Sequence, residues 1–157
     1  MGKGKAKMEF LPYEHKVHYY ETDQMGIAHH SNYIRWFEEA RVDFMEQGGF
    51  SYKELESRGI ISPVLEVNAK YKSMCYFGDR LCICTFIKQY TGTRLTVGYR
   101  IIKKETTELC CEGESKHCFL NSNGKPILLE RKQPDFHQKF LECYEVTRKG
   151  KYEYEIG

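Results

Sequence analysis

The stretch "SNYIRWFEEARVDFMEQGG" (residues 31–49) has the apolar period of a helix with one buried face. Apolar side chains recur there at the i, i+3, i+4, i+7 and i+11 spacing, at Tyr33, Trp36, Phe37, Ala40 and Phe44. Most of the charged residues fall off this stripe: Glu38, Glu39, Arg41 and Asp43. Ser31 or Asn32 can cap the first turn, and the glycine pair at 48–49 can end the helix. We therefore predict a helix over residues 32–47.

Shorter elements flank this helix. The segment "EHKVHYYE" (14–21) has the β-branched and aromatic composition of a strand, which we expect at 14–20. After the helix, Ser51 and Glu54 form a capping-box pattern, and Gly59 can terminate a second, short helix.

The remainder of the chain is dominated by strand-like runs. Four of them are rich in Val, Ile, Tyr, Phe and Thr: residues 60–72, 79–90, 93–104 and 108–121. Turn residues separate them at 77–79, 91–93 and 121–124. Because the connections are short, we expect consecutive strands to be antiparallel neighbours. "PDFHQKFLECY" (134–144) then predicts a closing helix after Pro134.

This order of elements indicates an α+β fold. A long helix that precedes a single antiparallel sheet can bury its apolar face only by lying across that sheet. Such a sheet leaves edge strands, so pairing between two subunits is a natural extension of it. We expect a lead-in at 1–12, one domain at 13–143 and a charged tail at 144–157.

Composition limits the classes of partner. The 24 Lys and Arg residues nearly balance 22 Asp and Glu, which gives a net charge of +2 and makes nucleic acid an unexpected partner. A small anionic ligand needs only a few well-placed cations and is not excluded. The chain has no run of roughly 20 apolar residues that could span a membrane. We expect a soluble, cytoplasmic protein.

The seven cysteines lack the CxxC pairs of zinc and redox sites: Cys75, Cys82, Cys84, Cys110, Cys111, Cys118 and Cys143. We interpret them as free thiols buried on strands in a reducing compartment. Cys82 and Cys84 would share one strand face, but they would supply only two of the ligands that a metal needs.

Candidate chemistry lies in "ETDQMGIAHHSNY" (21–33), which joins the first strand to the long helix. Free N–H groups and the helix dipole favour developing negative charge there. Gly26 and Ile27 could offer backbone amides to an acyl oxygen. Asp23 could attack the carbonyl or deprotonate a water, and His30 could hydrogen-bond the substrate or the acid.

Each of these residues also has a purely structural interpretation. Asp23 could be a turn aspartate whose side chain bonds the backbone. His29 and His30 are adjacent and should project in different directions, and zinc-binding histidines on one helix prefer i, i+4 spacing. Tyr19 and Tyr20 could be packing residues. There is neither a GxSxG motif nor a glycine-rich phosphate loop.

The run from Tyr19 to Tyr33 resembles the 4-hydroxybenzoyl-CoA thioesterase family of hotdog-fold acyl-CoA thioesterases. The shared spacing includes Thr22, Asp23, Gly26 and His30. The likeness covers most of the chain and includes "AKYKSMCYFGDRLCI" (69–83).

The resemblance implies a sheet wrapped around a central helix, homodimers or homotetramers, and hydrolysis of an acyl-CoA substrate without metal or cofactor. The family's catalytic aspartate maps onto Asp23, and its helix-mouth amides map near Gly26 and Ile27. A tyrosine and a histidine used by a bacterial branch map onto Tyr19 and His30.

The sequence departs from the family pattern in places. His29 stands where several members have an aromatic residue, and the cations available for CoA phosphates are Arg94 with Lys70, Lys72 and Lys103 as spares. A neighbouring branch carries its carboxylate within the helix, which would point to Glu38 or Glu39, but the intact TDxxG turn favours Asp23. A non-catalytic module that binds acyl-CoA or acyl carrier protein, or a hotdog dehydratase, remains an alternative.

Overall fold

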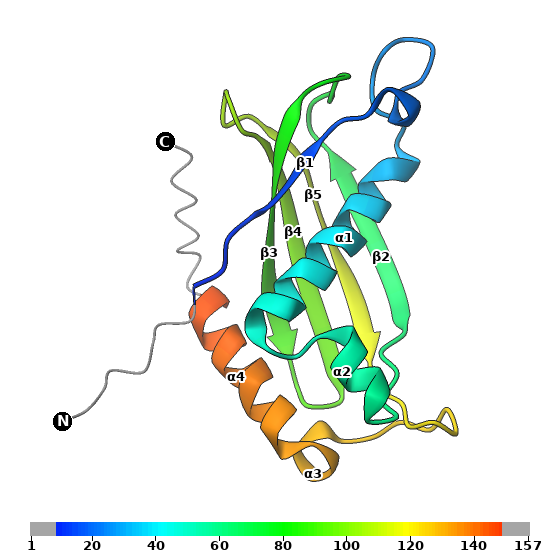
Figure 1. Ribbon diagram of the computed structural model, residues 1–157, viewed down its shortest axis with the longest axis vertical. Coiled ribbons are helices and arrows are strands. Elements are labelled where there is room, and N and C mark those ends of the chain that lie inside the picture. The colour runs from blue at the N-terminus through cyan, green and yellow to red at the C-terminus, as the bar shows by residue number, and fades with distance from the viewer. Residues whose placement is uncertain (1–8, 149–157) are drawn as a thin grey trace, which may run out of the picture.

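The computed structural model describes residues 9–148, which form one sheet and the helices that cover it (Figure 1). In chain order the elements are β1 (Tyr13–Lys16), the 3₁₀ helix η1 (Tyr19–Glu21), α1 (Ser31–Gly48), α2 (Tyr52–Ser57), β2 (Val64–Tyr71), β3 (Arg80–Tyr90), β4 (Arg94–Lys103), β5 (Leu109–Cys118), α3 (Leu129–Lys132) and α4 (Pro134–Arg148).

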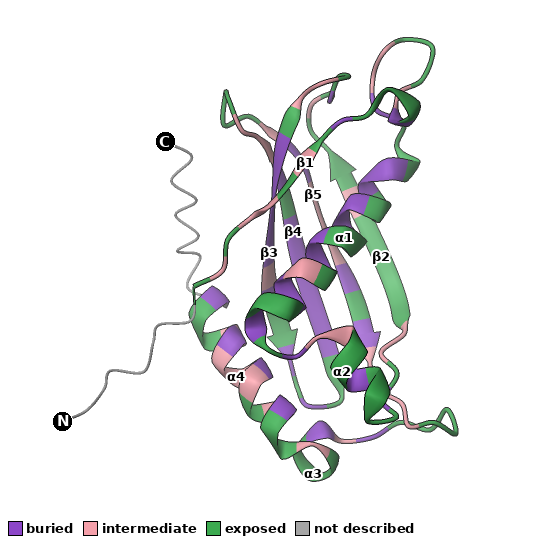
Figure 2. Ribbon diagram, in the orientation of Figure 1, coloured by how far each residue is buried: buried purple, intermediate pink, exposed green. Residues whose placement is uncertain are grey.

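The five strands form an antiparallel sheet in the order β1-β3-β4-β5-β2. Figure 1 shows α1 lying across one face of this sheet, with α4 beside it. The buried residues concentrate between α1 and the sheet (Figure 2), where the Phe37 ring stacks on Tyr99 with centroids 4.4 Å apart. The architecture is the α+β hotdog fold that the sequence predicts.

The long helix is confirmed, and its apolar stripe is buried as expected. All five stripe residues are at most 4% exposed. Gly49 ends the helix in the left-handed conformation, with a φ of 78°. Arg41 lies off the apolar stripe, yet its side chain is also buried. Its guanidinium donates to the hydroxyls of Tyr52 and Tyr99, over 2.6 and 2.9 Å.

The expected pairing of consecutive strands holds for β3, β4 and β5 but not for β2. β2 pairs with β5 at one edge, while β1 pairs with β3 at the other, so residues 72–79 run from edge strand β2 to β3, which lies next to the opposite edge. The turn residues between β2 and β3 do not make these two strands pair, because β1 lies along the outer side of β3. Val17 holds that crossing segment, because its N–H donates to Asp79 O and its carbonyl accepts from Gly78.

β1 is shorter than the strand expected at 14–20, since η1 takes over at Tyr19. The chain turns there because the Glu21 carboxylate accepts from the His18 N–H over 2.8 Å, which replaces a ladder hydrogen bond. The second helix begins as predicted, with the Ser51 hydroxyl accepting from the Glu54 N–H.

α1 packs against the sheet at a position without a side chain. A Cβ added to Gly113 of β5 would lie 2.2 Å from Asn68 O and 2.8 Å from Cε2 of Phe37. Only glycine therefore lets the Phe37 ring approach the strand this closely.

Six of the seven cysteines are buried, and Cys118 is half-buried. Five lie on β3 or β5, while Cys75 lies in the segment between β2 and β3 and Cys143 lies in α4. Most of the expected lead-in at 1–12 and of the tail at 144–157 lies outside the described residues, although α4 continues through 144–148. Across the described part of the chain, none of the helices has the length and apolar character needed to cross a membrane.

Candidate active site

The loop between η1 and α1 (residues 22–30) gathers four of the six candidate residues at the N-terminal end of α1, and a fifth, Tyr19, begins η1. Within it, the Asp23 N–H donates to Ile27 O over 2.9 Å, and the Gly26 N–H donates back to Asp23 O over 3.0 Å. Gly26 adopts a φ of 77°, which explains why glycine is favoured in this tight turn. The loop is thus a defined turn rather than a free linker.

Asp23 combines the structural and the chemical interpretation. Its Oδ1 accepts from the Met25 N–H over 2.8 Å, which is the expected turn contact. The side chain is nevertheless exposed, and no hydrogen bond to Oδ2 is found within residues 9–148. The backbone therefore orients the carboxylate while one oxygen faces solvent.

The backbone amides of Gly26 and Ile27, which were expected to stabilise an oxyanion, differ in whether they already donate a hydrogen bond. The Gly26 N–H is used to close the turn, whereas no hydrogen bond from the Ile27 N–H is found in the described part of the chain. The neighbouring Ala28 N–H donates to Cys75 O over 2.7 Å and fixes this strand-like segment against residues 72–79. Ile27 therefore carries the amide that an acyl oxygen could use.

A cavity of about 330 Å³ opens beside this loop. It is lined by Ile27, Ala28, His30, Tyr33, Tyr71, Lys72, Ser73 and Met74. The Tyr71 hydroxyl donates to His30 O over 3.4 Å, which joins β2 to the start of α1 across the cavity wall. The cavity thus connects one candidate amide, one candidate histidine and one cation.

The adjacent histidines differ in their hydrogen bonds, but the expectation that they project in different directions was wrong, because their rings lie against each other. His29 Nδ1 lies 2.8 Å from the Ser31 hydroxyl and accepts from the Ser31 N–H, so its ring supports the first turn of α1. His30 is the N-cap residue and its side chain lines the cavity. The centroids of the two rings are 4.1 Å apart, and the ring planes are tilted by 31°.

The outer candidates lie at different distances from the cavity. Tyr19 is 78% exposed and packs edge-on against Phe77, so in one chain it borders the loop without reaching the cavity wall. Arg94 begins β4 at the end of β3 where Tyr90 pairs with Leu95. The Asp23 loop follows β1 at the opposite end of β3, so one subunit does not bring Arg94 and Asp23 together.

Within a single chain, the lysines considered as alternatives to Arg94 lie closer to the cavity than Arg94 does. Lys72 lines the cavity, and its Nζ lies 3.7 Å from Glu112. Lys103 ends β4 near the same end of the sheet and lies 3.6 Å from Asp79. Lys70 lies on edge strand β2, opposite Glu112 of β5.

Sequence reasoning missed the residue that organises the loop, which is Glu21. Its Oε1 accepts from the His18 N–H and lies 2.8 Å from Nε2 of His15, and its Oε2 accepts from the indole N–H of Trp36 over 2.6 Å. Its carbonyl accepts from the His29 N–H and from the Asn32 side chain, each over 2.8 Å. The only signal in the sequence was an acid next to Thr22 in an otherwise aromatic run.

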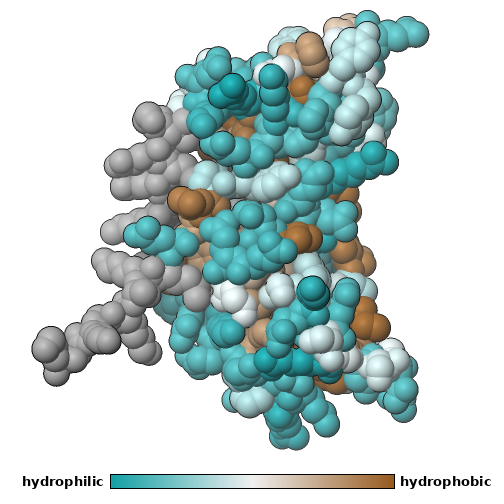
Figure 3. All heavy atoms as spheres, in the orientation of Figure 1, coloured by the Kyte–Doolittle hydropathy of each residue, from teal (hydrophilic) through white to brown (hydrophobic). Residues whose placement is uncertain are grey.

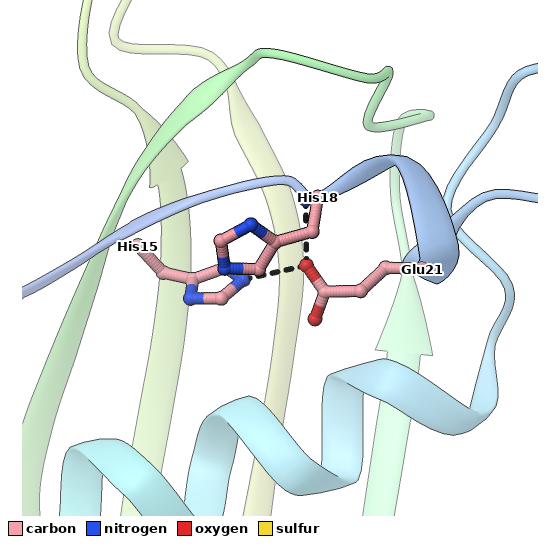
Figure 4. A group of neighbouring side chains, drawn as sticks. All are labelled: His15, His18 and Glu21. Carbon is pink, nitrogen blue, oxygen red and sulfur yellow. Dashed lines mark hydrogen bonds and ion pairs between the residues drawn. The ribbon is translucent and has the colours of Figure 1, made fainter.

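Glu21 is buried and ionised. Burial alone would raise the pKa of its carboxyl, but the hydrogen bonds from His18, His15 and Trp36 outweigh burial and leave the pKa below its usual value. Figure 4 shows His15, His18 and Glu21 pointing toward one another. Among the described residues, this is the one group whose side-chain atoms converge as metal ligands do.

The surface beside the site is apolar. Figure 3 shows hydrophobic atoms along the margin formed by β2. Val64, Leu65 and Val67 are 38–48% exposed on this edge strand, and Tyr71 and Met74 continue the exposure toward the cavity. A chain in isolation leaves this edge and the site open on the same side.

Comparisons with known proteins agree with this architecture. The family model described as the thioesterase-like superfamily matches residues 17–143. The Bacillus subtilis protein named "Putative acyl-CoA thioesterase YneP" is 36% identical over 137 residues, which cover 87% of this chain and 96% of that protein. The Escherichia coli acyl-CoA thioester hydrolase YbgC is 30% identical over 94 residues, or 60% of this chain and 70% of YbgC.

A solved structure supports the same grouping. The DHNA-CoA thioesterase of Staphylococcus aureus superposes with a TM-score of 0.81 at 35% identity, over 88% of this chain and 93% of that one. The match of the family model covers α1, the Asp23 loop and strands β2 to β5 of the sheet. The chain belongs to the thioesterase-like superfamily.

Proposed function

We propose that the protein hydrolyses an acyl-CoA thioester to the free carboxylic acid and CoA, with Asp23 as the reactive carboxylate. The observation that carries the proposal is the pairing of an oriented, exposed Asp23 with an Ile27 amide that has no partner within residues 9–148. Relatives at 30–36% identity are named for the same class of reaction.

The geometry suggests how the parts would act. The thioester carbonyl would accept a hydrogen bond from Ile27 N–H near the positive end of α1, which favours the charge that develops on oxygen. In one route Asp23 would remove a proton from the attacking water and return it to the departing CoA sulfur as the C–S bond breaks. In the other, Asp23 would attack the carbonyl carbon, CoA would leave as a thiolate that takes a proton from water, and a further water would hydrolyse the resulting mixed anhydride and restore Asp23. His30 would orient the carbonyl from the cavity wall. Gly26 would shape the turn, and Tyr19 would contact substrate or a second subunit.

The proposed reaction needs neither a metal nor an organic cofactor. A thioester carbonyl has little resonance stabilisation, so one carboxylate and one oxyanion donor can suffice. For the CoA phosphates, Lys72 and Lys103 are the nearer cations of the same chain, because Arg94 begins β4 at the opposite end of the sheet.

We further propose that the working unit is a homodimer, alone or within a homotetramer, formed along β2. This strand exposes apolar side chains and an unpaired edge, which proteins normally cover. Antiparallel pairing of two β2 edges would bring the far end of one sheet toward the loop of the other, and a second subunit's Arg94 could then approach the CoA phosphates. The finer assignments, to the 4-hydroxybenzoyl-CoA branch and to the cytoplasm, stay part of this proposal.

The test is turnover of short, long and aromatic acyl-CoAs, followed by chromatography of the released CoA. Asp23→Asn should lower kcat by orders of magnitude with KM little changed, because the carboxylate acts mainly in the transition state. Asp43→Asn, on α1 and away from the loop, is the matched control. Near wild-type turnover by Asp23→Asn would remove Asp23 from the reaction, and tight acyl-CoA binding without turnover by the wild type would favour a binding module.

A further inference from the structure

We propose that His15, His18 and Glu21 form a Zn²⁺ site that fastens η1 to β1. Each residue supplies one ligand atom, and these atoms all lie within 4.8 Å of one another (Figure 4). Two imidazoles and one carboxylate are a ligand set that zinc and neighbouring first-row divalent cations accept, with water in the fourth position. The site is separate from the proposed hydrolysis and does not rest on it.

Two of the three ligands are already in place. His15 Nε2 and Glu21 Oε1 are 2.8 Å apart, and both side chains are at most 8% exposed. Zn²⁺ held at bonds of about 2.0–2.1 Å would require ligand atoms separated by about 3.3 Å in a tetrahedral site. Moving His15 Nε2 and Glu21 Oε1 slightly further apart would therefore make room for the ion.

The third ligand can move. His18 is exposed, and its ring stacks on Tyr20 and packs edge-on against His15 at the start of η1. Rotation of this ring costs stacking contacts. Its exposure also leaves the fourth position open to water.

The surroundings match those of metal ligands in other proteins. A histidine that binds a metal through one nitrogen usually donates from the other to a carboxylate, and ligating carboxylates are themselves hydrogen-bonded. His15 Nδ1 lies 3.7 Å from Glu39, and the second oxygen of Glu21 is held by Trp36. When Nε2 binds the ion, the His15 proton would reside on Nδ1 and face Glu39, so no charge would be left unpaired.

Occupancy would act on the loop through Glu21. The carbonyl of this residue holds the His29 N–H and the Asn32 side chain, which set the start of α1. Fixing the carboxylate with an ion would therefore restrain the segment that carries Asp23, without placing the ion on the substrate.

The test uses full-length protein without a histidine tag, stripped of metal and titrated with Zn²⁺ by calorimetry and with Co²⁺ by visible absorption. We expect one ion per chain, with the d–d bands of a nitrogen and oxygen site. His18→Gln should lose this binding by at least tenfold, because one of the three protein ligands is removed. His137→Gln, which removes a histidine bonded to Tyr90 elsewhere in the fold, should bind like the wild type.

Two outcomes would overturn the proposal. The first is the absence of stoichiometric binding to the wild type. The second is binding that persists in His18→Gln or that shows thiolate charge-transfer bands, since the ion would then be held elsewhere, for example by cysteines. Circular dichroism of His18→Gln checks that the exposed substitution leaves the fold intact. Glu39→Gln supplies an independent measure, with an expected loss of about 10- to 100-fold in affinity.

Discussion

The indole N–H of Trp36 donates to Glu21 Oε2 over 2.6 Å, which joins the buried face of α1 to the loop that carries Asp23. Trp36 is fully buried and Glu21 is 5% exposed, so the contact is made away from water. A charge-assisted hydrogen bond of this kind is stronger than a neutral one. A direct hydrogen bond therefore couples the buried face of α1 to the candidate site.

Breaking this contact should affect stability and turnover together. Trp36→Phe leaves a buried carboxylate oxygen without its donor, which costs roughly 1–3 kcal/mol. Urea unfolding of Trp36→Phe, Glu21→Gln and the double variant forms a double-mutant cycle, and we expect a clear coupling between the two positions. Purely additive effects would contradict a direct interaction.

Acid should weaken the fold through His117. Burial, with the Arg41 charge, lowers the pKa of His117 from 6.5 to about 4. The unfolded chain then binds a proton near pH 6.5 while the folded chain does not bind it until about pH 4, so unfolding takes up a proton between these values. The contribution is present above pH 6.5 and is lost as pH falls toward 4, by roughly 3 kcal/mol.

The measurement is the free energy of unfolding in urea at several pH values for the wild type and His117→Gln. Gln can still hydrogen-bond Ser115, which lies 2.7 Å from Nε2 of His117, but it does not titrate. The variant should have a shallower slope between pH 4 and 6.5. Parallel curves for the two proteins would rule out this role of His117.

A charge on the β2 edge should separate the proposed subunits. Leu65→Lys places an ammonium group on a strand whose apolar side chains are exposed in one chain, and lysine on an edge strand opposes pairing. Light scattering after size exclusion should show a smaller species, and acyl-CoA turnover should fall if a second subunit completes the site. Val146→Lys makes the same change on an exposed apolar residue of α4 and serves as the control. An unchanged mass for Leu65→Lys would move the interface elsewhere.

Adding one methyl group to β5 should lift α1 from the sheet. Gly113→Ala would place Cβ 2.2 Å from a backbone oxygen and against the Phe37 ring, so we expect a loss of about 1–3 kcal/mol in unfolding free energy. Gly124→Ala meets no atom within 4 Å and tests only the cost of a left-handed φ. Thermal unfolding should rank Gly113→Ala as the more destabilised variant.

The periodic segments could be predicted from sequence because their partners lie within the same element or across a short turn. The stripe of α1 from Tyr33 to Phe44 and the β3-β4-β5 meander are of this kind. The pairing of β2 with β5 was missed, because it joins strands that are not consecutive, while β1 lies along the side of β3 that β2 could have taken. No local pattern records that competition.

The turn that carries Asp23 could be predicted from the sequence, but the contacts around it could not. The spacing around Asp23 and Gly26 indicated a turn, and the structure contains one. The roles of Glu21 and Arg41 depend on groups further along the chain, Trp36 and Tyr99, so a charged residue in a helical or aromatic run gave no sign of burial. Whether the Gly26 or the Ile27 amide is free was likewise set by the closure of the turn.

The burial of the cysteines has a practical consequence for measuring the proposed product. Only Cys118 among the seven is partly exposed, so a thiol reagent should find few groups on the folded chain and seven on the unfolded one. CoA released by hydrolysis could then be counted against a low and constant background. If the protein unfolded during the assay, its buried cysteines would react with the same reagent and raise the absorbance. Each progress curve would therefore also report how much protein remained folded.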